Sequence, residues 1–138
     1  MSTNLDSIIQ RRQVMQGQAE FLKGCASRWK DAPGQEEPER NTQIQLVQTF
    51  YYFMEGLGEL YSSEEDFLLP KLIPSIAGEI KARHRYVMNN LEAVYRSLVE
   101  LSSKVQLPNK ESVWDSINGL CHTISQLCLD ENQFSYPE

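Results

Sequence analysis

The chain has 138 residues, of which 41% are hydrophobic and 23% are charged, and its formal net charge is −6. This composition is ordinary for a globular protein, so we expect a single domain over residues 1–138. Basic residues form no run, which argues against nucleic acid as a partner, and no stretch of about 18 apolar residues is present to span a membrane. The N-terminus also lacks the basic and apolar regions of a signal peptide, so we expect a cytoplasmic protein.

Three cysteines, an odd number, give no pattern of paired disulfides. Cys121 and Cys128 lie seven positions apart, about two turns or ~10 Å on one helix, which is too far for a bridge. We therefore expect all three to be reduced thiols, as is usual in the cytoplasm.

Apolar residues recur at three- and four-residue spacing, which is the pattern of helices with one buried face. The first predicted helix runs from about residue 4 to 29, and Arg12 interrupts its apolar stripe. The second runs from about residue 41 to 69, where Glu64 continues the apolar face one turn beyond Leu60.

The third predicted helix covers about residues 75–105, with His84 on its apolar stripe. The fourth covers about residues 109–134, and Glu131 lies one turn after Leu127 on its inner face. Proline-containing segments separate the four helices. Four helices with short connections predict an all-α, antiparallel up-down-up-down bundle, in which these four polar side chains share one layer.

Two helix ends carry a common frame, LYSSEEDFLLP from Leu60 and LCLDENQFSYP from Leu127, with four of eleven positions identical. With RHRYVMNNLEAV from Arg83, these frames make the chain resemble the hemerythrin family, the bacterial HHE cation-binding domains. The resemblance covers nearly the whole chain and implies an up-down four-helix bundle around a non-haem di-iron centre. It also implies metal ligands at Glu64 and Glu131, because the second and fourth helices of that family carry His-x-x-x-Glu followed by Pro.

The chain departs from the family at the residues that hold iron. Leu60 and Leu127 stand at ligand positions of the second and fourth helices, and Arg12 stands on the first helix where the family has His. Glu64, His84 and Glu131 are then the remaining candidate metal ligands. Two carboxylates and one imidazole can hold one iron or other divalent cation weakly, but not a di-iron centre. We therefore expect no cofactor, with a single bound cation as the alternative.

A buried carboxylate needs a counter-charge or a proton. Arg12 supplies a bidentate cation, so we expect it to bridge Glu64 and Glu131 in place of a metal ion. The alternatives are a weakened metal site and side chains that are mostly in water. A shift of one residue in the first helix would instead place Arg11 or Gln13 in the layer.

The remaining polar and aromatic residues have plainer interpretations. We expect Glu65 and Asp66 to form a solvated face and His122 to lie on the outer face of its helix. We expect Tyr61 and Tyr136 to be aromatic residues at the boundary between core and solvent. The aromatic run FYYFM carries large side chains on several helix faces, which suggests a contact surface in addition to the core. We expect Tyr51, Tyr52 and Met54 to be partly outward, either packed on a loop or forming an interface in a homodimer.

No nucleophilic triad, phosphate loop or zinc motif is present, so the sequence does not indicate an enzyme. Three functions stay open. The first is a non-enzymatic binding or sensing module with a degenerate metal site. The second is a divergent cation site used to sense oxygen, nitric oxide or metal. The third is a structural bundle that binds a partner protein.

Overall fold

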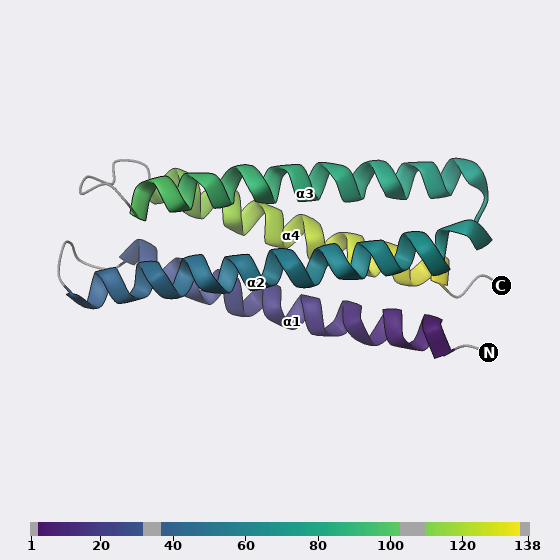
Figure 1. Ribbon diagram of the computed structural model, residues 1–138, viewed down its shortest axis with the longest axis horizontal. Helices are drawn as coiled ribbons and strands as arrows, with labels where there is room; N and C mark the ends of the chain where they lie inside the picture. Colours follow the sequence, from purple (N-terminus) through teal and green to yellow (C-terminus); the bar gives the residue numbers. More distant parts are fainter. Residues whose placement is uncertain (1–2, 32–36, 103–109, 136–138) are drawn as a thin grey trace.

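The chain folds as four long helices, described here from a computed structural model over residues 3–31, 37–102 and 110–135 (Figure 1). The helices are α1 Thr3–Asp31, α2 Glu37–Phe67, α3 Pro74–Ser102 and α4 Lys110–Ser135, with a short 3₁₀ helix, η1, at Leu69–Lys71. The described residues contain no strand. The prediction of an all-α four-helix bundle is therefore confirmed.

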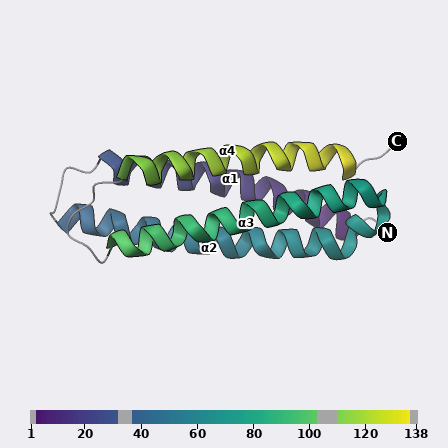
Figure 2. The ribbon, with the colours of Figure 1, turned by 90° about the horizontal axis from the view of Figure 1, so that it is seen from above.

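Consecutive helices run in opposite directions along one elongated bundle (Figures 1 and 2). Helix α1 packs against α2 and α4, and α3 packs against the same two helices, so α2 and α4 lie diagonally. As a result, the first turns of α1 and α3 lie at the same end as the last turns of α2 and α4.

The helix ends differ from the predicted ones by a few residues. Helix α2 begins at Glu37 instead of residue 41, because Pro38 falls in the first turn, where a missing N–H costs no helical hydrogen bond. It ends at Phe67 instead of residue 69, because the chain there tightens into η1. Helix α3 ends at Ser102, and the last turn predicted for it lies outside the described residues.

The predicted apolar stripes form one continuous core along the bundle. Its members include Leu60 and Leu127, the two leucines at the family's ligand positions. At the end away from the polar side chains, Trp29 Nε1 donates to Gln43 Oε1, and Gln43 Nε2 donates to the backbone oxygen of Leu98, 3.3 Å away. A polar residue thus ties α1, α2 and α3 together inside the core.

The three cysteines, Cys25, Cys121 and Cys128, are buried and free. In the described part of the chain, no helix is both long and apolar enough to cross a membrane.

Candidate functional site: a buried charged layer

Four buried ionisable side chains, one from each helix, meet in one layer of the bundle. We call this set the polar layer: Arg12, Glu64, His84 and Glu131. Each is at most 2% exposed, and each continues the apolar stripe of its own helix. The antiparallel arrangement brings them together, because α1 and α3 contribute residues near their starts while α2 and α4 contribute residues near their ends.

Arg12 lies between the carboxylates of α2 and α4. Its Nε is 2.5 Å from Glu64 Oε2 and 3.9 Å from Glu131 Oε2, and its Nη1 donates to Asn132 Oδ1 at 2.9 Å. Arg11 and Gln13, the alternatives for this place, are exposed. The guanidinium is therefore the cation inside the layer, with its closest contact on the α2 side.

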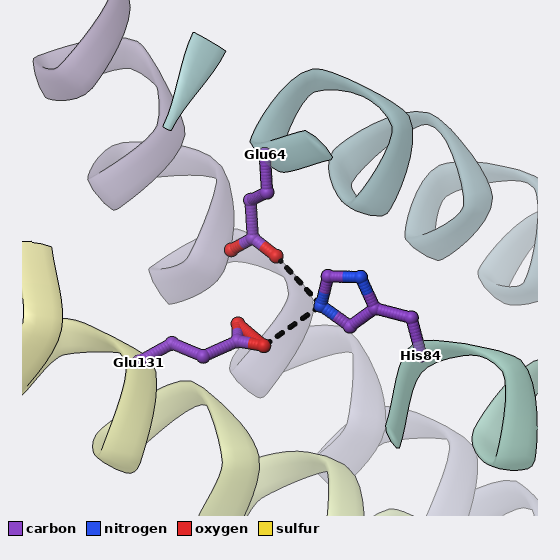
Figure 3. Close-up of side chains that lie close together, drawn as sticks. All are labelled: Glu64, His84 and Glu131. Carbon is purple, nitrogen blue, oxygen red and sulfur yellow. Dashed lines mark hydrogen bonds and ion pairs between the residues drawn. The ribbon is translucent and has the colours of Figure 1, made fainter. Parts of the chain in front are cut away.

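His84 approaches carboxylates with both ring nitrogens. Its Nε2 lies 2.8 Å from Glu131 Oε1 and 3.1 Å from Glu64 Oε1 (Figure 3). Its Nδ1 lies 3.0 Å from Glu65 Oε2. Ionised carboxylates only accept hydrogen bonds, so a ring that is protonated on both nitrogens satisfies these contacts best. The Nε2 proton points to Glu131, the nearer acceptor, and Glu64 Oε1 makes a charge contact.

Neighbouring charges shift the pKa values within the layer in different directions. Burial lowers the pKa of His84, but its bonds to Glu131 and Glu64 outweigh burial and raise the pKa to about 10. Burial raises the pKa of Glu64, but His84 and Arg12 lower it more, so the net shift is downward. Burial and the charge of Glu64 raise the pKa of Glu131 to about 7, although His84 opposes them. Glu131 is therefore the carboxyl that holds a proton most readily.

Tyr61 is part of this site, and its prediction as a boundary aromatic is wrong. Only 4% of it is exposed, and its ring stacks on His84 with centroids 3.7 Å apart and planes 7° apart. The sequence signal was its position three residues before Glu64, which is one turn away on the same side of α2. The second predicted boundary aromatic, Tyr136, lies outside the described residues.

Glu65 is also part of the site, although the sequence indicated a solvated face. Its side chain is 36% exposed, and the hydrogen bond to His84 Nδ1 holds it against α3. Asp66 and His122 are exposed, as expected. Glu65 lies one turn after Tyr61, beside the buried face of α2, whereas Asp66 lies on the outer face, and α3 supplies the partner that Glu65 meets.

Glu64, His84 and Glu131 each offer a ligand atom, and these atoms lie within 4.8 Å of one another. They do not fit a di-iron centre, because Leu60 and Leu127 supply no donor atom and Arg12 already contacts a Glu64 oxygen. A single ion at Nε2 would also have to displace a proton from a ring whose pKa is about 10.

Comparisons with protein-family models, with curated proteins and with solved structures each gave no match. The resemblance to the hemerythrin family therefore stays a prediction from the sequence.

Replacing Arg12 with alanine should strongly destabilise the protein, because it strands the Glu64 and Glu131 carboxylates in the core. The expected loss is about 3–5 kcal/mol, or a fall in Tm on the order of 10 °C. Arg85→Ala is the matched control, since Arg85 is an exposed arginine that directly follows His84 on α3. Thermal unfolding followed by circular dichroism measures both, and similar Tm values for the two variants would contradict the role given to Arg12.

The free energy of unfolding should fall as the pH rises from 7 to 9. The folded protein keeps the proton of His84 up to a pH of about 10, whereas the unfolded chain loses it near pH 6.5. The stability that this proton contributes is therefore fully present below pH 6.5 and is lost as the pH approaches 10. The expected loss over this range is roughly 2–3 kcal/mol. Above pH 9 the buried thiols of Cys121 and Cys128, whose pKa values are raised to about 12, add to the fall.

His84→Gln provides the control for this pH dependence, because glutamine can accept and donate hydrogen bonds but does not titrate. His84→Gln alone would let the pKa of Glu131 rise further, because His84 lowers it, so the control variant also carries Glu131→Gln. Urea unfolding at pH 7, 8 and 9 should give a flat profile for this double variant and a falling one for the unsubstituted protein. A fall of equal size in both proteins would assign the effect to other groups.

Proposed function

We propose that this chain is a non-enzymatic, hemerythrin-like binding module in which an internal ion-pair network takes the place of a metal centre. The observation that carries the proposal is the buried guanidinium of Arg12, 2.5 Å from Glu64 and 3.9 Å from Glu131. A permanent cation at this distance neutralises the carboxylates that would otherwise attract a metal ion. It would also repel any divalent ion placed between them.

The second cation, His84, supports the same proposal. Its two ring nitrogens face Glu131 and Glu65, so the layer satisfies its own charges with side chains of the bundle. Two cations of the chain, Arg12 and His84, thus face the two carboxylates of the layer, Glu64 and Glu131. In the proposed function the layer stabilises the bundle, and binding takes place on the outer surface, to a second copy or to a partner protein.

A second candidate keeps the cation-binding chemistry: a single-ion site on Glu64, His84 and Glu131 that senses oxygen, nitric oxide or metal. The observation that favours it is the cluster of three ligand atoms within 4.8 Å. The contact of His84 Nδ1 with Glu65 is a further argument, since metal-bound histidines commonly donate their other ring N–H to a carboxylate.

Metal content after anaerobic incubation with Fe(II), desalting and brief exposure to air distinguishes the two candidates. The proposed function predicts far less than one iron per chain and no charge-transfer band in the near-ultraviolet or visible spectrum. One ion per chain that is lost in Glu64→Ala but kept in Glu59→Ala, an exposed carboxylate on the same helix, would establish the second candidate. Two irons per chain would contradict both interpretations.

A double-mutant cycle on Arg12 and Glu64 tests whether charge pairing, not packing alone, makes Arg12 important. Arg12→Met keeps much of the aliphatic volume, and Glu64→Gln keeps the shape of the carboxylate. The double variant should be more stable than the sum of the single effects predicts, by about 1–3 kcal/mol, because neither charge is left alone. Additive losses in urea unfolding would show that the two charges are not coupled.

A further inference from the structure

A groove runs between α1 and α2 on the outside of the bundle, and large apolar side chains are exposed along it. Its volume is about 460 Å³. Val14, Phe21 and Tyr52 line it and are 51%, 54% and 69% exposed. Single exposed apolar residues are common on protein surfaces, but three around one groove mark a contact surface.

The shape of this α1–α2 groove suits a partner that also presents a pair of packed helices. Gly56 lies in the groove, where a Cβ atom would be 3.2 Å from Met15 Sδ, so the two helices approach closely there. Tyr52, one turn away on α2, also lines the groove and is 69% exposed. A two-fold contact sets the same face of each copy against the other, so the exposed Tyr52 of one copy would face the groove of the other.

The charges of the groove are also self-complementary. Arg11 lies on the α1 wall and Glu59 on the α2 wall. They lie near the same end, because Arg11 donates to Ser63, one turn from Glu59. A two-fold axis parallel to the groove sets α1 of each copy on α2 of the other, which brings Arg11 of one copy to Glu59 of the other. The opposite arrangement, with α1 on α1, makes no such pair.

The face that carries the groove is large enough for a stable dimer. Helices α1 and α2 have 29 and 31 residues. Two such helices side by side present roughly 45 Å by 20 Å, or on the order of 900 Å². That is about the area that each partner buries in an average stable interface.

We propose that the α1–α2 groove binds a second copy of this chain in a parallel two-fold arrangement, with Arg11 of each copy against Glu59 of the other and Tyr52 against Phe21. This inference rests on the proposed function, since it names a second copy as the partner bound on the outer surface, but it does not depend on what the polar layer holds. It also reduces the interface that the aromatic run predicted, Tyr51, Tyr52 and Met54, to Tyr52. Tyr52 lines the groove, whereas Tyr51 packs toward Tyr95 of α3, with ring centroids 5.9 Å apart, and Met54 packs against the core.

Sedimentation equilibrium on the full chain tests the association. We expect a monomer–dimer equilibrium with a dissociation constant in the micromolar range. Tyr52→Glu should raise that constant by about tenfold or more, since it places a charge at the centre of the contact. Tyr86→Glu is the matched control, because Tyr86 is 62% exposed on α3, outside the groove. It should change the constant by less than about twofold. Circular dichroism checks that both variants stay folded.

A charge exchange tests the arrangement of the two copies. Arg11→Glu and Glu59→Arg alone should each weaken dimerisation, by about three- to tenfold, because like charges then meet across the axis. The double variant should return the dissociation constant to within about twofold of the original value, because the pair is restored with reversed signs. Absence of this recovery would overturn the parallel arrangement.

Other results would overturn the second copy as the occupant. A strict monomer at high concentration would do so, as would equal effects of Tyr52→Glu and Tyr86→Glu. A monomer that binds the dye anilinonaphthalene sulfonate in a manner abolished by Tyr52→Glu would assign the groove to a small apolar ligand instead.

Discussion

The buried guanidinium of Arg12 is the constraint on which the rest of this structure depends. A cation that is 0% exposed is tolerated only where carboxylates meet it, and Glu64 and Glu131 come from α2 and α4. Their contacts fix the rotation of α1, α2 and α4 about their own axes. His84 fixes α3 in the same way, through its contacts with Glu131 and Glu65. The layer thus joins all four helices at one level of the bundle.

The same interaction gives the interior and the surface of the bundle different roles in the proposed function. In the proposed function, the carboxylates of Glu64 and Glu131 engage Arg12 and His84 instead of a metal ion, and Leu60 and Leu127 lie one turn before them. On the outside of the bundle, by contrast, the exposed side chains of Val14, Phe21 and Tyr52 lie around one groove between α1 and α2. The proposed function therefore places binding on the surface of the bundle.

The sequence by itself determined the four helices and the inward direction of the layer residues. Periodicity is a local property, so a stripe at three- and four-residue spacing identifies the buried face of each helix before any partner is known. Antiparallel packing then placed Arg12, Glu64, His84 and Glu131 at one level without further information. The sequence predicted the helix ends less accurately than the buried faces. A proline is accepted in the first turn of a helix, so Pro38 does not mark the point before which α2 cannot begin.

Only the tertiary structure decided how the members of the layer pair. Arg12 lies much closer to Glu64 than to Glu131, and Tyr61 stacks on His84. Glu65 joins the layer whereas Asp66, its neighbour, stays exposed. These outcomes depend on the distances and rotations between helices that are remote in sequence. A residue's place on its own helix gives the face it occupies, but the side chains it meets there come from the other three helices.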